Sequence, residues 1–201
     1  MNPIRLFHFI SPKHLQPTVR KVSKPSVSQL MLLYVLPLSL IPCVMMYLRL
    51  YHHYPKLFVD HLPGNRLLMV SAELLFLQLG VLLLMAWITQ NLAEMVNIKP
   101  DFRDSLLIMT IATTPMWLTS LFYIVPSLSF NVVVHAIAVL LSILLVYRGV
   151  RYIFDVRERG ALVTLSMAIV CTAGLGFAVI LIGSLISWEA IEQLQFAVQK
   201  M

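Results

Sequence analysis

The sequence contains few charged residues, few glycines and almost no cysteine. Asp, Glu, Lys and Arg make up 12% of the 201 residues, against about 25% in an average soluble protein. The two cysteines and seven glycines exclude a disulfide scaffold and a collagen-like repeat. What the chain has in abundance is apolar side chains, 59% of the total. This balance excludes an ordinary soluble domain and a disordered chain, and it predicts a protein whose solvent is lipid.

Five apolar stretches are long enough to cross a bilayer as helices, since a span takes about 20 mostly apolar residues. They are expected near 28–48, 67–89, 105–125, 130–149 and 161–187. The predicted fold class is therefore all-α, a polytopic membrane protein with one transmembrane domain over residues 28–187. A basic amphipathic segment, residues 1–27, precedes this domain, and a short tail, residues 188–201, follows it.

Prolines inside two of the spans predict bent helices. Pro37 and Pro42 lie in the first span and Pro115 lies in the third. Each proline leaves a backbone carbonyl without its usual N–H donor, which bends a helix unless another group replaces that donor. Thr113 and Thr114 directly precede Pro115, so we expect a hydroxyl to satisfy the freed carbonyl.

The distribution of basic residues predicts the orientation in the membrane. Eleven of the fifteen Lys and Arg residues fall in the N-terminal segment and in the connections after the second and fourth spans. Because Lys and Arg accumulate on the cytoplasmic side, we expect a cytoplasmic N-terminus and an external C-terminus.

Ionisable residues within a span are candidates for function, because placing a charge at the bilayer centre costs about 2.5–3.5 kcal/mol even on insertion scales. Glu73 and His135 meet this criterion, and helix geometry places each about 8–9 Å from the outer end of its span. We expect these two residues either to form a pair or each to face water in an outer cavity together with Gln78. Alternatively, Glu73 extends towards Arg66 and His135 bonds a neighbouring backbone or side-chain group.

No arrangement typical of catalysis or metal binding is present in the sequence. There is no phosphate-binding glycine loop, no HExxH, no GxSxG and no pair of intramembrane aspartates. His52, His53, Asp60 and His61 superficially resemble a metal site, but adjacent histidines point apart and no second cluster completes it. Asp101 and Asp104 stand where the third helix begins and are expected to cap it. The sequence thus predicts no enzyme, no metal and no cofactor.

Arginines at the inner ends of the last two spans predict an electropositive cytoplasmic surface. Arg148 and Arg151 are expected to face Asp155 at the next turn. The candidate surface for lipid or a partner comprises Arg20, Lys21, Arg148, Arg151, Arg157 and Arg159. We expect it to contact anionic lipid headgroups, or to dock a membrane-protein partner. The basic residues are dispersed between apolar runs, which argues against nucleic acid as the partner.

Small residues four apart occur twice in the fifth span, as Thr172 with Gly176 and Gly174 with Ala178. This spacing lets helices approach closely. It predicts internal packing or a seam between copies in a homo-oligomer.

Several stretches together resemble the Yip family of five-span membrane proteins. LFHFISPKHL is similar to the family's amphipathic lead, YVLPLSLIP to its first span, ATTPMWLTSLFYIVPSL to its proline-bearing third span, and VYRGVRYIFDVRERGAL to its fourth span and inner loop. The resemblance extends from residue 5 to about 175. It implies a bacterial member in the inner (cytoplasmic) membrane. The DLYGP stretch and long cytosolic N-terminal region of the eukaryotic relatives, which associate with Rab-type GTPases, are absent.

The leading hypothesis is a non-enzymatic membrane protein that organises or scaffolds membrane proteins or lipids. The alternative is a small oligomeric transporter, channel or lipid scramblase that uses the outer polar site, since bent helices beside intramembrane ionisable groups are typical of transport. Against this alternative, the sequence shows no acid in the inner half to match the polar residues of the outer half.

Overall fold

The spans predicted from the sequence are helices in the computed structural model, which describes residues 26–53, 64–125 and 127–199. Every regular element in this part of the chain is a helix, and five are long and apolar enough to cross a membrane. These spans are Val27–Leu48, Leu68–Met95, Phe102–Ile124, Ser129–Ile153 and Arg159–Gly183. The predicted all-α, five-span fold class is confirmed.

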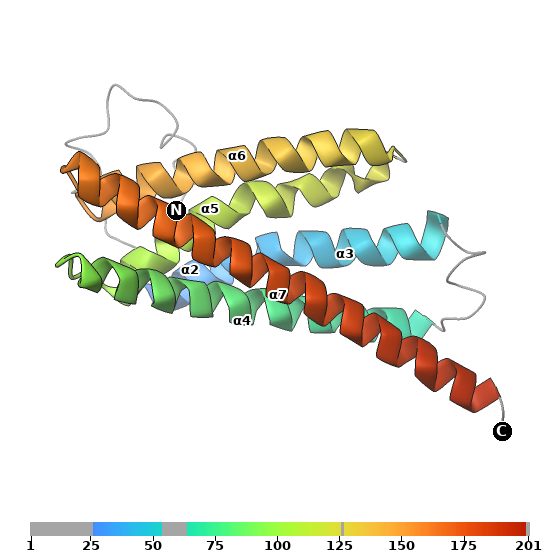
Figure 1. Ribbon diagram of the computed structural model, residues 1–201. Coiled ribbons are helices and arrows are strands. Elements are labelled where there is room, and N and C mark those ends of the chain that lie inside the picture. The colour runs from blue at the N-terminus through green and yellow to red at the C-terminus, as the bar shows by residue number, and fades with distance from the viewer. Residues whose placement is uncertain (1–25, 54–63, 126, 200–201) are drawn as a thin grey trace.

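The helices run back and forth and lie roughly antiparallel to their chain neighbours (Figure 1). In chain order the elements are α2 Val27–Leu30, η3 Met31–Val35, α3 Leu36–His53, α4 Gly64–Met95, α5 Phe102–Thr119, η5 Ser120–Ile124, α6 Leu128–Ile153 and α7 Arg159–Gln199. We call the end of the bundle that contains Ser26 and the connections 96–101 and 154–158 the N-terminal end. The opposite end, which contains the turn after η5 and the last residues of α7, is the C-terminal end.

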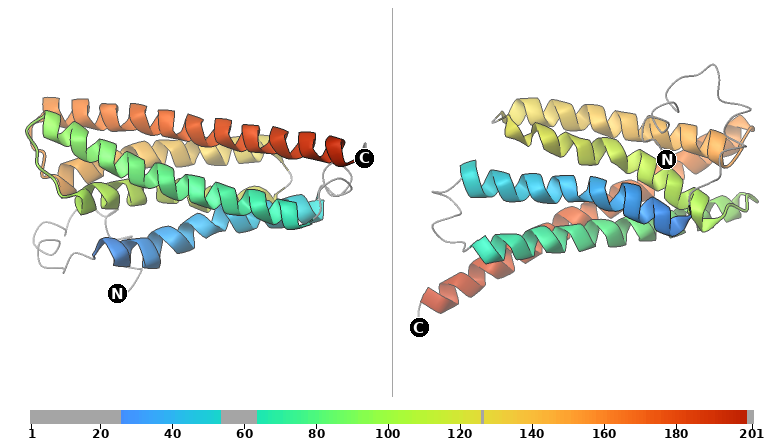
Figure 2. Two further views of the ribbon diagram at one scale, coloured as in Figure 1. Left: turned by 90° about the horizontal axis from the view of Figure 1, so that it is seen from below. Right: turned by 180° about the vertical axis from the view of Figure 1, so that it is seen from behind.

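Two helices extend beyond the spans expected for them. The α4 span continues to Met95 rather than stopping near residue 89. The helix α7 is 41 residues long and includes the region expected as a tail, so it is about 60 Å in length, twice the hydrocarbon thickness of a bilayer. Its last turns project beyond α3 and α4 at the C-terminal end (Figures 1 and 2).

The prolines affect the backbone in different ways. Before Pro37 the helix widens into the π-helix η3, in which the Leu36 N–H donates to the Met31 carbonyl five residues earlier. Because Pro37 has no N–H, such a wide turn is a usual accommodation in a continuous helix. The helices α3 and α5 continue through Pro42 and Pro115.

The threonines before Pro115 do not satisfy the carbonyl that we expected them to satisfy. Pro115 removes the donor of the Ile111 carbonyl, four residues earlier. Thr113 Oγ1 instead donates to the Met109 carbonyl at 2.7 Å, and Thr114 Oγ1 to that of Thr110 at 2.8 Å. Each hydroxyl reaches the carbonyl four residues before its own position, the ordinary geometry for Thr in a helix.

The connection between α4 and α5 begins with a Schellman motif. The Ile98 N–H donates to the Ala93 carbonyl and the Asn97 N–H to that of Glu94, with Asn97 at φ 62°. Asn adopts this left-handed conformation more easily than most residues. Asp101 occupies the expected N-cap position of α5, but its side chain makes no capping hydrogen bond. Its backbone carbonyl accepts from the Asp104 and Ser105 N–H groups.

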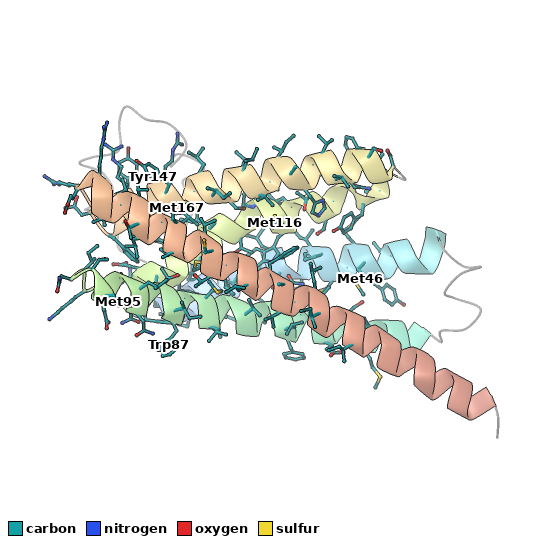
Figure 3. All side chains as sticks on the ribbon, in the orientation of Figure 1. Met46, Trp87, Met95, Met116, Tyr147 and Met167 are labelled. Atoms are coloured by element: carbon teal, nitrogen blue, oxygen red, sulfur yellow. The ribbon has the colours of Figure 1, made fainter. Side chains whose placement is uncertain are left out.

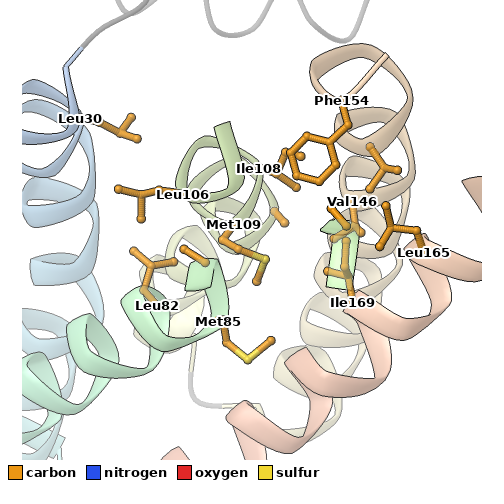
Figure 4. Packing of buried hydrophobic residues seen from close by; sticks show 14 of the residues in the cluster. Leu30, Leu82, Met85, Leu106, Ile108, Met109, Val146, Phe154, Leu165 and Ile169 are labelled. Atoms are coloured by element: carbon orange, nitrogen blue, oxygen red, sulfur yellow. The ribbon is translucent and has the colours of Figure 1, made fainter. Parts of the chain in front are cut away.

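The main apolar cluster lies in the half of the bundle nearer the N-terminal end. Residues of α4, α5, α6 and α7 meet there, with Leu30 and Val35 added from the start of the first span (Figure 4). The buried members from the four long helices include Leu82, Met85, Ala86, Leu106, Ile108, Met109, Val146, Val150, Leu165 and Ile169. This cluster fixes the relative positions of the helices that carry the candidate sites.

Glycines permit two close helix crossings. A Cβ on Gly176 of α7 would lie 3.2 Å from Met85 and Val81 of α4, and a Cβ on Gly183 would lie 3.1 Å from Leu77. A Cβ on Gly149 of α6 would lie 3.1 Å from Ile108 of α5. The predicted small pair at Gly176 therefore packs inside the chain, whereas Gly174 has nothing within 4 Å of the corresponding position.

Candidate functional sites in the transmembrane domain

Gln78 joins three helices through its side-chain hydrogen bonds. Its Oε1 accepts from the Trp117 indole N–H at 2.9 Å, which joins α4 to α5. Its Nε2 donates to Cys43 Sγ at 3.8 Å, which joins α4 to α3. Cys43 Sγ in turn donates to the Ser39 carbonyl at 3.4 Å. Since Gln78 and Trp117 are both buried, these bonds satisfy polar groups that lipid could not satisfy.

His135 forms a second polar cluster, within the hairpin of α5 and α6. Its Nδ1 lies 2.8 Å from the Asn131 carbonyl oxygen, and its Nε2 lies 3.1 Å from the Tyr123 hydroxyl and 3.2 Å from Thr119 Oγ1. The Tyr123 ring stacks on the imidazole with the ring centroids 5.6 Å apart.

The hydrogen-bond geometry assigns the tautomer of His135. A carbonyl oxygen only accepts, so Nδ1 carries the proton and Nε2 of the neutral ring is an acceptor. Thr119 Oγ1 donates its proton to the Met116 carbonyl at 2.7 Å. The donor to Nε2 is therefore Tyr123. In this arrangement both imidazole nitrogens are bonded inside the α5–α6 hairpin.

Glu73, Gln78 and His135 do not form one site. Glu73 is exposed on α4, a helix that packs against α3, α5 and α7. His135 lies on α6, which packs against α5 and α7, and its polar contacts are with its own hairpin. Gln78 is bonded to α3 and α5 instead. The geometry of His135 matches the alternative in which this histidine bonds neighbouring backbone and hydroxyl groups.

The arginines at the N-terminal end have different contacts from those expected. Asp155 pairs with Arg157, with Nε and Oδ1 3.3 Å apart, rather than with Arg148 or Arg151. The reason is that α6 ends at Ile153, so Asp155 follows the helix and takes a left-handed φ of 53°. The Arg151 guanidinium lies over the Tyr152 ring, 5.7 Å from its centroid. Arg20 and Lys21 lie outside the described residues.

Charge at this end is nearly balanced in the described part of the chain. Lys99, Arg151, Arg157 and Arg159 are exposed, and so are Glu94, Asp101, Asp155 and Glu158. Arg148 is half-buried. Most of the excess positive charge therefore belongs to residues 1–25, which contain five basic residues and no acid.

The described residues contain no group of three or more His, Cys, Asp or Glu side chains placed to hold a metal ion. Asp60, His61 and the side chains of His52 and His53 fall outside the described part of the structure.

The sequence matches the Yip1 domain family over residues 9–188. The chain belongs to the Yip1 domain family. No curated protein and no solved structure matches it. With five apolar helices, this Yip1 domain protein is an integral membrane protein, and the resemblance noted from the sequence is confirmed at the level of the family.

Trp117 and Tyr123 are the polar partners in this Yip1 domain that sequence reasoning missed. An indole N–H or a phenol hydroxyl within a span requires an acceptor or donor when it is buried, so Trp117 and Tyr123 in the third span were detectable as half of a polar pair. Their helix spacing does not say which partner they meet. Cys43 is buried and accepts a hydrogen bond from Gln78.

The structure also buries polar groups in the N-terminal half of the Yip1 domain. Asp104 is 8% exposed, within the first turn of α5. The hydroxyls of Thr89, Ser105 and Ser166 are buried on three different helices without a hydrogen-bond partner. A buried polar group without a partner costs free energy. This half of the domain is therefore less uniformly apolar than its sequence indicated.

Proposed function

We propose that this Yip1 domain protein is a non-enzymatic organiser of membrane proteins or lipids. The observation that carries the proposal is that the intramembrane polar side chains Gln78 and His135 form hydrogen bonds between helices. Gln78 joins α4 to α3 and α5, and His135 joins α6 to the end of α5 and to η5. Groups that are bonded between helices stabilise one arrangement of a rigid body and are not poised to transfer a proton to a substrate. A rigid body with apolar outer faces suits a scaffold.

The proposed contact with anionic lipid is assigned mainly to the N-terminal segment. Exposed acids offset the exposed bases of the connections 96–101 and 154–158, whereas residues 1–25 carry Arg5, Lys13, Arg20, Lys21 and Lys24 without an acid. Each basic residue near an anionic surface contributes about 1 kcal/mol of attraction. The proposal places these residues on the cytoplasmic side, as the charge count predicts.

The test is extraction of the full-length protein from its native membrane into detergent-free nanodiscs, followed by mass spectrometry of every retained protein and lipid. We expect a protein partner or anionic lipid to be enriched over a control protein with five spans. One variant changes the five basic residues of 1–25 to Gln, and its matched control changes the exposed Arg151, Arg157 and Arg159 to Gln. The first variant is expected to lose more anionic lipid than the second.

Two results would contradict this proposal. Equal lipid retention by both variants and the wild type would remove the role assigned to the N-terminal segment. Substrate turnover by the purified protein that is lost on Glu73→Gln would show that the protein is an enzyme.

A second candidate function, transport, is favoured by the buried polar groups of the N-terminal half. Thr89, Ser105 and Ser166 supply hydroxyls without partners in that half, as a hydrophilic path through it would require. The variants Thr89→Cys and Ser105→Cys test this in a Cys171→Ser background. Labelling by a membrane-impermeant thiol reagent from the adjacent side would support transport. Protection of both cysteines in the native membrane would leave the scaffold as the better account.

A further inference from the structure

Three buried hydroxyl groups in the N-terminal half of the bundle have no hydrogen-bond partner in the described part of the chain. They belong to Thr89 of α4, Ser105 of α5 and Ser166 of α7, residues that are 0%, 0% and 6% exposed. A hydroxyl in a helix ordinarily donates to the carbonyl four residues earlier, as Thr110 does to Leu106 at 2.8 Å. Burying a hydroxyl without any partner costs free energy, so three such groups at one end of the domain require an explanation.

The four helices around these hydroxyls form a ring. The helix α4 packs against α5 and α7, and α6 packs against the same two helices. Figure 4 shows Met85 of α4, Met109 of α5, Val146 of α6 and Ile169 of α7 gathered at the centre of this ring. We call these four residues the apolar layer, since all of them belong to the buried hydrophobic cluster.

Thr89, Ser105 and Ser166 form the next layer towards the N-terminal end, which we call the hydroxyl layer. Each lies three or four residues from the apolar-layer side chain of its own helix and therefore on the same face. Because α4 runs towards the N-terminal end while α5 and α7 run away from it (Figure 1), the three steps lead in one direction. The bond between Gln78 and Trp117 gives the same register. From that bond, Thr89 and Ser105 lie eleven and twelve residues towards the N-terminal end, or about 16–18 Å.

The surroundings of Thr89 on α4 are small and inward-facing. Trp87, two residues away and so on the opposite face, lies on the side of α4 that points away from α7 (Figure 3) and is 56% exposed. Ala86 and Ala93 flank Thr89 on its own face, and both are 0% exposed. Their short side chains fill less of the ring than the methionine of the apolar layer does, so the hydroxyl layer is where a small ligand fits.

Water is the ligand whose chemistry suits the hydroxyl layer. Each of the three hydroxyls donates one hydrogen bond and accepts others, and a buried water typically bonds about three polar groups that lack another partner. The three side chains are neutral, so they call for a neutral ligand that both donates and accepts.

We propose that the hydroxyl layer binds one or more ordered water molecules inside the ring of α4, α5, α6 and α7. The water supplies the hydrogen bonds that the described helices do not supply to these hydroxyls. The apolar layer separates the site from the polar contacts of Gln78, so the water does not by itself form a path across the membrane. The site is independent of the proposed function, because internal water is compatible with a scaffold and with a transporter.

Solid-state NMR of the full-length protein in liposomes tests the site directly, through magnetisation transfer from water protons to threonine side chains. Thr89 is the probe and Thr110 is the matched control. Both are buried threonines, 0% and 3% exposed, but the Thr110 hydroxyl is bonded within its own helix. We expect the water-derived signal of Thr89 to build up several-fold faster than that of Thr110. Equal build-up at the two residues overturns the proposal.

The direction of a stability change gives a second test. Thr89→Val removes the hydroxyl and keeps the shape of the side chain. With water bound, the variant leaves that water short of a partner and the midpoint of detergent unfolding falls; with a dry hydroxyl, it removes an unsatisfied polar group and the midpoint rises. We expect a fall larger than that of Thr110→Val, which leaves no group unpaired. A rise, or a fall no larger than that of the control, contradicts bound water.

Two further comparisons identify the ligand and its sharing between hydroxyls. If one water site joins the helices, Ser105→Ala lowers the unfolding midpoint less in the Thr89→Val background than in the wild type, whereas additive losses refute a shared site. A hard cation is the competing ligand, since it also binds oxygen atoms. A wild-type midpoint that is higher in sodium chloride than in choline chloride, with the difference lost in Thr89→Val, would replace water by a cation.

Discussion

The two halves of the bundle are held together by different interactions. Towards the N-terminal end, four helices share a continuous cluster of buried apolar side chains. Towards the C-terminal end, neighbouring helices are joined by side-chain hydrogen bonds at Gln78 and His135. Packing of apolar side chains stabilises the first half, and a few hydrogen bonds between side chains stabilise the second.

One face of α6 shows how burial decreases from the N-terminal half to the C-terminal half. Val132, Val139 and Val146 are seven residues apart and share a face of the helix. Val146 is 3% exposed beside Ile169 of α7, whereas Val139 is 44% and Val132 59% exposed. The two helices part because α7 crosses from α6 to α4 (Figure 1). Where a packing partner leaves, polar bonds within α3–α4–α5 and α5–α6 maintain the remaining contacts.

The largest effect should follow from a cavity in the packed half. Leu106 is fully buried in the apolar cluster, so Leu106→Ala is expected to lower the free energy of unfolding by about 2–5 kcal/mol, the usual cost of such a truncation. Unfolding in mixed detergent micelles, followed by circular dichroism, measures it. Leu140→Ala, at a position 68% exposed, is the control and should change little. Equal losses in the two variants would refute the view that packing is concentrated at the N-terminal end.

A smaller loss of stability is expected when the hydrogen bond between Gln78 and Trp117 in the other half is removed. Gln78→Leu leaves the buried Trp117 indole N–H without its acceptor, which should cost about 1–3 kcal/mol. Trp117→Phe removes the donor as well, so the double variant should lose less than the sum of the single losses. The measurement is a double-mutant cycle of unfolding free energies. Strict additivity would mean that the 2.9 Å contact contributes nothing to stability.

Removing one hydroxyl from the His135 cluster should have a milder effect. Tyr123→Phe deletes the donor to Nε2 but keeps the ring that stacks on the imidazole, so we expect a loss of about 0.5–1.5 kcal/mol. The assigned tautomer can be checked separately by nitrogen NMR of His135, in which Nδ1 should carry the proton. A protonated Nε2 in the neutral ring would contradict Tyr123 as the donor.

The sequence was sufficient to predict the five spans, and it singled out Gln78 and His135, which do make polar contacts between helices. Length and apolar content determine the spans, and an intramembrane Gln or His signals a polar contact because lipid cannot satisfy it. The partners could not be predicted, because equal depth on two helices does not say which faces meet. Glu73 and His135 were expected at similar depth, yet His135 is bonded within its own hairpin.

The spacing of residues in the sequence also could not predict which side chains pair near the ends of helices. Asp155 follows Arg151 by four residues, which on a continuous helix would make them neighbours. The helix ends at Ile153, two residues before Asp155, so the helical spacing assumed for this ion pair does not apply. The buried hydroxyls of Thr89, Ser105 and Ser166 were not predicted because Ser and Thr are common in spans without a functional role.

The smallest expected effect is a gain in stability at the connection 154–158 between α6 and α7. Asp155 holds a left-handed φ of 53°, a conformation that costs most residues roughly 1 kcal/mol and glycine almost nothing. Its ion pair with Arg157 offers little in return, because both side chains are largely exposed, at 74% and 87%. Asp155→Gly is therefore expected to raise the midpoint of detergent unfolding slightly, whereas Asp155→Ala should lower it, since Ala tolerates this φ less well than Asp. A loss of stability in the glycine variant equal to that in Arg157→Ala would show that the ion pair, rather than backbone strain, dominates at this turn.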